Sequence, residues 1–310
     1  MRNRFRPALV CAAWLTATVA MAQTPLSRAE VDKQTSSFVQ SYAASTAKLH
    51  QIARWADPLC VQVTGLIPDQ AAQVKARVED VAKAVGVTIA PPGCAPGIEI
   101  VFSDQPQRVL DNVAARREVL LGYDHRDAKT LKAVTRPIQA WYVTATVGGG
   151  GPNAGAVFSS ADQSANRGGS DRGVPVQTNN RVRDDPDTWP PTGCADSHFS
   201  SCLKSVFDNV LVVIDNGRVR DRSLGLVSDY VTMLALSQPR SLDGCNVLPS
   251  VTDLFAACPG RNAPDGLTPA DAAYLTSLYA ADLEANKAGE KSEISGRMGR
   301  IFGTAKVLVR

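Results

Sequence analysis

The chain has 310 residues, of which 33 are Lys or Arg and 30 are Asp or Glu. Three of the arginines lie in the first 22 residues, which contain no acidic side chain, so the remainder is formally neutral. A neutral chain has no general attraction for polyanions, and this excludes nucleic acids and anionic membrane surfaces as expected partners.

Residues 1–22 have the pattern of a secretory signal peptide. A basic start is followed by an apolar stretch from 8 to 19 and by Ala20-Met21-Ala22, a small-x-small tripeptide typical of a cleavage site. The apolar stretch is shorter than the ~20 residues that span a bilayer. We therefore expect an exported protein, periplasmic or secreted, with no membrane span after cleavage.

The cysteines predict disulfide bonds. Of the seven cysteines, Cys11 lies in the signal peptide, which leaves Cys60, Cys94, Cys194, Cys202, Cys245 and Cys258. An even number in an exported chain favours three disulfides, and nearest neighbours give the pairs 60–94, 194–202 and 245–258 among about 15 possible pairings. Cys194, His198 and Cys202 also have metal-ligand spacing, but no fourth ligand lies nearby in sequence, which favours the disulfide.

The sequence from 27 to 147 predicts three helices that alternate with three strands. Capping residues and helical periodicity mark the helices, and β-branched or alternating apolar residues mark the strands. In chain order we expect a helix from the capping box Ser27–Glu30, a strand at Leu59–Val63, a helix from Pro68 to Gly86, a strand at Gly97–Phe102, a helix from about Gln105 to Leu121 and a strand at Ile138–Val147. This order predicts an α+β fold, a single domain over 23–310 in which helices pack on one mixed sheet.

The C-terminal part predicts a buried strand, a hairpin and two helices. Ser205–Ile214 is a continuous apolar run, and Asn216-Gly217 is a strong hairpin signal. After the hairpin we expect a short returning strand at Arg218–Arg220, a helix at Leu224–Leu236 and a helix capped by Thr268-Pro-Ala-Asp271.

Two segments are expected to lie outside the packed core. Residues 148–193 are rich in Gly, Ser, Asn, Asp and Pro, too poor in apolar surface to offset the entropy of ordering, and predict a disordered, flexible insertion. Its alternative role is a partner-binding loop. The charged, Gly-broken tail 282–310 is expected to be loosely held, although Ile301 and Phe302 offer apolar side chains for docking.

The helix Leu224–Leu236 has the register of a zinc-protease active-site helix, which follows a strand and a turn. Together with Leu267–Tyr279 and Arg54–Pro58, it resembles an uncharacterised family of secreted bacterial proteins that is itself similar to zincin-type metalloproteases. In zincins this helix carries His-Glu-x-x-His, in which two imidazoles bind zinc and the carboxylate activates water. The resemblance implies a zincin-like active-site helix frame.

The metal-binding motif itself is degenerate in this chain. Ser228 and Thr232 stand at the two histidine positions, and Asp229 stands at the position of the general base. We therefore expect no catalytic residue, no metal ligand and no cofactor, and the resemblance implies Ser228, Asp229 and Thr232 as candidate binding residues. The apolar positions of the same helix also fit a structural role, as a helix buried in the core.

The leading functional hypothesis is an exported pseudoenzyme, a non-catalytic protein that acts as a binding or envelope-associated module. Its partner would be a protein, a peptide or an envelope component of unknown identity. The alternative is a periplasmic or secreted hydrolase with an unrecognised active site around Asp229, completed by a distant histidine.

Overall fold

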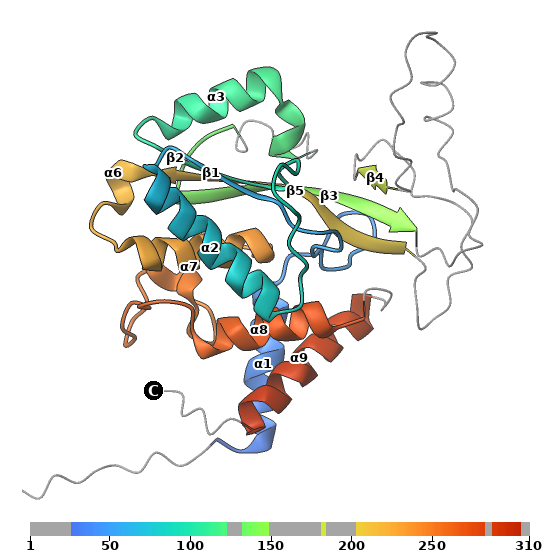
Figure 1. The fold of residues 1–310 in the computed structure, drawn as a ribbon. Helices are drawn as coiled ribbons and strands as arrows, with labels where there is room; N and C mark the ends of the chain where they lie inside the picture. The colour runs from blue at the N-terminus through green and yellow to red at the C-terminus, as the bar shows by residue number, and fades with distance from the viewer. Residues whose placement is uncertain (1–25, 123–131, 149–180, 184–202, 283–286, 305–310) are drawn as a thin grey trace, which may run out of the picture.

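A computed structural model describes residues 26–122, 132–148, 181–183, 203–282 and 287–304 (Figure 1). A five-stranded sheet in the order β1-β2-β5-β3-β4 lies at the centre. The strands are β1 (Val61–Thr64), β2 (Ile98–Ser103), β3 (Ile138–Gly148), β4 (Arg181–Arg183) and β5 (Leu203–Asp215). β1, β2 and β5 are parallel, whereas β3 is antiparallel to both β5 and β4. The predicted mixed sheet with packed helices is confirmed.

Two helices begin at the predicted capping residues Ser27 and Thr268, and a third begins after Ser223. Ser27, Ser223 and Thr268 each accept a hydrogen bond from a backbone N–H of the first turn that follows. The helices are α1 (Arg28–Tyr42), α2 (Pro68–Ala84), α3 (Pro106–Arg116), α6 (Asn216–Val219), α7 (Leu224–Leu236), α8 (Pro269–Ala280) and α9 (Lys287–Thr304), with the 3₁₀ helices η1 (Glu118–Leu121) and η3 (Val251–Phe255).

The sheet is covered on both faces, as Figure 1 shows. α3 and η1 lie on one face, where a small core contains Leu110, Leu121, Trp141, Leu211 and Val213. α2 and α7 lie on the other face, and α1, α8 and α9 form a further layer beyond them. β5 is therefore buried along nearly its whole length, which explains its continuous apolar sequence.

The predicted hairpin at Asn216-Gly217 is wrong. The Asp215 side chain accepts a hydrogen bond from the Arg218 N–H and caps the short helix α6. β5 already has β2 on one side and β3 on the other, so a strand that returned at Arg218–Arg220 would find no free edge beside it. The helix N-cap therefore prevails over the local turn signal.

Two segments expected to be loose are partly ordered. Within 148–193, residues Arg181–Arg183 pair with β3 as strand β4, and the rest of the segment lies outside the described residues apart from Gly148. Within 282–310, α9 packs against α1 and α8 and buries Ile294 and Met298, so this part of the tail belongs to the core. Ile301 and Phe302 pack against that core, as their apolar character suggested.

Two of the three predicted disulfides are confirmed. Cys60 is bonded to Cys94 with a Cα–Cα distance of 6.1 Å, and Cys245 to Cys258 with 5.6 Å. The 194–202 pair, like the signal peptide, lies outside the described residues. None of the described helices is long and apolar enough to cross a bilayer.

Candidate functional site

The hydroxyl groups of Ser228 and Thr232 are used inside helix α7. Ser228 is 1% exposed and its Oγ donates to the Leu224 carbonyl at 2.7 Å. Thr232 is fully buried, and its Oγ1 donates to the Ser228 carbonyl at the same distance. Both are hydrogen bonds to the preceding turn, so each hydroxyl proton already has an acceptor on the same helix.

Asp229 joins three separate parts of the fold. Its Oδ1 accepts a hydrogen bond from Arg77 Nε of α2 at 2.5 Å, and its Oδ2 accepts one from the Leu267 N–H at 3.1 Å. Gly266 lies so close that a Cβ there would be 2.8 Å from Oδ2. Because both carboxylate oxygens already bind donors, Asp229 ties α7 to α2 and to the segment before α8. No pattern in the sequence pointed to Arg77 as its partner.

The structure brings no catalytic set together on α7 among the described residues. His50 is exposed in the segment after α1, and the other two histidines lie outside the described part of the chain. Where the chain is described, no cluster of three or more His, Cys, Asp and Glu side chains has the arrangement of a metal site. The three candidate binding residues thus act as framework contacts of a buried helix.

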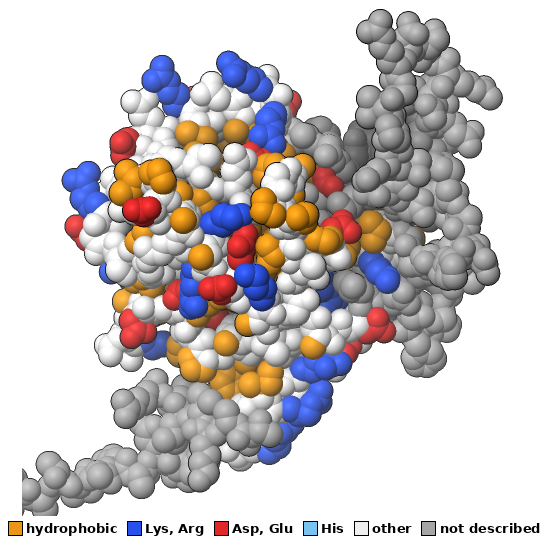
Figure 2. Space-filling view, in the orientation of Figure 1, with side chains coloured by type: hydrophobic (Ala, Val, Ile, Leu, Met, Phe, Trp, Pro, Cys, Tyr) orange, Lys and Arg blue, Asp and Glu red, His pale blue; other side chains and the backbone are white. Residues whose placement is uncertain are grey.

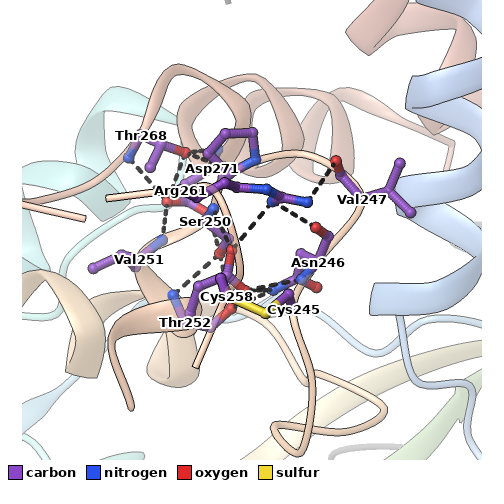
Figure 3. A network of polar contacts seen from close by, with 12 residues as sticks. Cys245, Asn246, Val247, Ser250, Val251, Thr252, Cys258, Arg261, Thr268 and Asp271 are labelled. Carbon is purple, nitrogen blue, oxygen red and sulfur yellow. Dashed lines mark hydrogen bonds and ion pairs between the residues drawn. A yellow bond between two sulfur atoms is a disulfide. The ribbon is translucent and has the colours of Figure 1, made fainter. Parts of the chain in front are cut away.

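A second polar cluster lies between η3 and α8 (Figure 3). The fully buried Asp271 carboxylate accepts hydrogen bonds from Ser250 Oγ at 2.6 Å, from the Val251 N–H at 2.7 Å, and from the Thr268 N–H and Oγ1 at 2.9 Å each. Burial raises the pKa of Asp271 to about 6, and the hydrogen bonds from Ser250, Thr268 and Val251 oppose this shift. The carboxylate is enclosed by its own donors, so it is a structural group.

The same cluster reaches the Cys245–Cys258 loop. Asn246 donates from its N–H to Asp253 Oδ1 at 2.9 Å, and Arg261 Nη1 donates to the Asn246 carbonyl at 2.7 Å. Figure 3 shows Asn246 and Arg261 pointing toward one another beside the disulfide. The network fixes the loop on the side of α8.

A hollow of about 580 Å³ lies beside β1 and is a candidate binding site in the described part of the chain. Its walls come from residues 60–62 at the start of β1, from Lys75 and Glu79 of α2, and from the segment 89–96 with its three prolines. Figure 2 shows this face, where hydrophobic side chains gather next to α2 beside basic and acidic ones. The hollow is therefore mainly apolar, with one ion pair at its rim.

The Cys60–Cys94 disulfide holds the two walls of the hollow together. Cys60 begins the β1 side and Cys94 lies in the proline segment, so the covalent bond fixes the segment to the sheet. Lys75 Nζ donates to the Val61 carbonyl at 3.0 Å and pairs with Glu79 at 2.8 Å. The sequence predicted the disulfide, but no signal showed that α2 would close the third side.

In comparisons with known proteins, no family model matches the chain, and no curated protein or solved structure matches it. The resemblance to secreted zincin-like proteins therefore stays a prediction, and the residues above carry the functional argument alone.

Proposed function

We propose that the chain is an exported, non-catalytic binding protein whose ligand lies in the hollow between β1, α2 and the segment 89–96. The observation that carries the proposal is the hollow itself, a mainly apolar depression of about 580 Å³ braced by the Cys60–Cys94 disulfide. Cavities of this size with mainly apolar walls and a few polar groups are typical of ligand sites. The two disulfides fit folding in an oxidising compartment.

The rigidity of the hollow supports a binding role. Three prolines restrict the backbone of the segment 89–96, and the disulfide ties that segment to the sheet. A site that is already ordered loses little conformational entropy when a ligand enters, and affinity increases accordingly.

The contacts of α7 support the absence of catalysis at the zincin-like position. Ser228 and Thr232 donate to their own helix, and Asp229 binds Arg77 and the Leu267 N–H. A general base needs a lone pair directed at water or substrate, whereas each oxygen of Asp229 already accepts one hydrogen bond from the protein. The zincin-like frame of α7 is, in this proposal, retained as a core helix.

Titration with small aromatic probes tests the binding function. We expect indole, phenylacetate and benzylamine to shift backbone amide resonances of ¹⁵N-labelled protein mainly at 60–62, 75–79 and 89–96, the walls of the hollow. Ala90→Trp places a large side chain in the hollow and should abolish these shifts. The matched control is Ala84→Trp, at an exposed position of α2 outside the hollow, which should preserve them. Shifts elsewhere, or none at all, would refute the proposed function.

The hydrolase alternative is tested by Asp229→Asn. In our proposal the substitution weakens the contact with Arg77 and lowers the free energy of unfolding by about 1–2 kcal/mol, as expected for a charged hydrogen bond that is partly exposed. Urea denaturation measures this loss. Asp80→Asn, at an exposed ion pair with Lys83, is the control and should change it by less than about 0.5 kcal/mol. A hydrolytic activity that disappears in Asp229→Asn while the fold stays intact would favour the enzyme instead.

A further inference from the structure

We propose that the hollow and the free edge of β1 receive an extended peptide segment of a partner protein, which adds to the sheet as a strand. This inference rests on the binding function proposed above and names the class of its ligand. Addition of a strand to an exposed sheet edge is a general mode of peptide recognition, in which the backbone provides affinity and side-chain pockets provide specificity.

β1 is the edge strand of the described sheet, and two of its outward N–H groups have no acceptor among the described residues. In a parallel pair, successive residues direct their backbone groups to opposite sides. The Cys60 carbonyl accepts a hydrogen bond from the Ile98 N–H of β2 at 3.0 Å, so Val61 and Val63 direct their N–H and carbonyl groups away from β2. The bond from Lys75 to the Val61 carbonyl agrees with this direction. No described residue accepts from the Val61 or Val63 N–H.

Residues 88–90 pair with Leu59 on the outer side of the β1 strand, but the chain turns away before it reaches Val61. The Leu59 N–H donates to the Thr88 carbonyl at 2.7 Å, and the Ala90 N–H donates to the Leu59 carbonyl at 2.9 Å. This parallel bridge ends at Pro91-Pro92, because proline has no N–H to donate. A partner strand that pairs with Val61 and Val63 would continue the same row from the point where the chain leaves it.

The hollow lies where the side chains of such a strand would point. Its lining of prolines and the disulfide suits an apolar or aromatic side chain of the partner. At the rim, the Lys75 side chain is 45% exposed and the Glu79 side chain 16%, so the lysine is the more accessible member of the ion pair. Charge complementarity therefore favours an acidic side chain next to the apolar one in the partner peptide.

Lysine and proline at a sheet edge also discourage pairing between copies of the same chain. Lys75 binds one carbonyl of β1 and leaves the two N–H groups of Val61 and Val63 open. It thus restricts the edge to partners that supply carbonyl acceptors at the right spacing and can share or displace the ammonium. In this proposal Lys75 makes strand addition selective. It does not prevent strand addition, because the Val61 and Val63 N–H groups still have no acceptor among the described residues.

The experiment separates backbone pairing from contact with the hollow alone. Peptides that bind the full-length protein are selected from a phage-displayed library of random linear dodecapeptides, and their Kd values are measured by isothermal titration calorimetry. Val63→Pro removes the outward N–H, which edge strands tolerate, while Val63→Ala shortens the same side chain and keeps that donor. We expect Val63→Pro to weaken binding at least about tenfold and Val63→Ala to stay within about threefold of the wild type. Selected peptides should share an apolar residue beside an acidic one.

N-methylation provides a readout that does not depend on a variant's folding. Methyl groups on alternate backbone nitrogens of a selected peptide should abolish binding to the wild-type protein in one register and spare it in the other, because only alternate residues face β1. Equal binding of every N-methylated form, or of Val63→Pro and Val63→Ala, would overturn the strand pairing. If no peptide is selected while the aromatic probes still bind the hollow, this inference fails and the proposed function stands. If neither probes nor peptides bind, both fail.

Discussion

Asp271→Ala is expected to lower the free energy of unfolding by about 3–5 kcal/mol, the loss typical of breaking a buried charged network. The Asp271 carboxylate is fully buried and accepts four hydrogen bonds, so alanine leaves the Ser250 hydroxyl and the Val251 and Thr268 N–H groups without this acceptor, whereas Thr268 Oγ1 keeps the Pro249 carbonyl. It also removes half of the capping box of α8, in which the Thr268 side chain binds the Asp271 N–H.

The loss should spread from α8 to the neighbouring 3₁₀ helix. Ser250 caps η3 and donates to Asp271 Oδ1, so the two helix starts share one acceptor. Urea denaturation at pH 7 measures the change in stability, and Asp265→Ala, at an exposed position of the same loop, is the control with an expected change below about 0.5 kcal/mol. A loss of less than about 1 kcal/mol in Asp271→Ala would contradict the account of the network.

Much of this fold could be predicted because the signals are local. The α7 bounds Leu224–Leu236 follow from an apolar stretch between Ser223 and Pro239, and the Thr268 cap needs only residues within one helical turn. The two confirmed disulfides join nearest neighbours along the chain. In each case the residues that decide the structure lie close together in sequence.

The candidate site could not be predicted, because its parts meet only in the folded chain. Lys75 reaches the hollow from α2, whereas Pro91 and Cys94 belong to a later loop. The contact between Arg77 and Asp229 likewise joins residues 152 positions apart. The hairpin prediction failed for the same reason: Asn216-Gly217 is a local signal, and only the sheet order shows that no free edge lies beside β5.

The tail illustrates how tertiary contacts override a weak local pattern. α9 contains glycines and many charges, which is why the sequence predicts a loose segment. In the fold, Gly299 allows close approach to α1, where a Cβ would lie 2.6 Å from Asp32 Oδ1. Glu290 at the start of α9 binds Arg54 in the core. The helix is therefore held by packing and by one buried ion pair more than by its own propensity.

That ion pair connects three segments. Arg54 is 2% exposed and Glu290 1%, with 2.6 Å between Arg54 Nη2 and Glu290 Oε1. Arg54 also donates to the carbonyls of Leu278, Ala281 and Asp282 at the end of α8, and Glu290 Oε2 accepts from the Ile52 N–H at 2.8 Å. The guanidinium thus serves as the C-terminal cap of α8 and as the counter-ion of α9.

Removing one partner alone should be strongly destabilising. We expect Arg54→Met to lower the free energy of unfolding by about 3–5 kcal/mol, because Glu290 loses its buried counter-ion and three carbonyls lose their donor. Glu290→Leu leaves Arg54 buried without its carboxylate and should cost a similar amount. The double variant removes both charges, so its loss should be smaller than the sum of the two single losses by at least about 2 kcal/mol.

A double-mutant cycle in urea measures this coupling. The matched control is the pair Glu293 and Arg297, an i,i+4 ion pair that is partly exposed on the same helix, for which Glu293→Leu and Arg297→Met should couple by about 0.3–0.5 kcal/mol. Additive losses at Arg54 and Glu290 would mean that the two side chains stabilise the fold independently, through their separate backbone contacts. A large coupling between Arg54 and Glu290, with a small one between Arg297 and Glu293, would support our account. It would show that burial gives the first ion pair its large contribution to holding α9 on the core, since both pairs include a residue of α9.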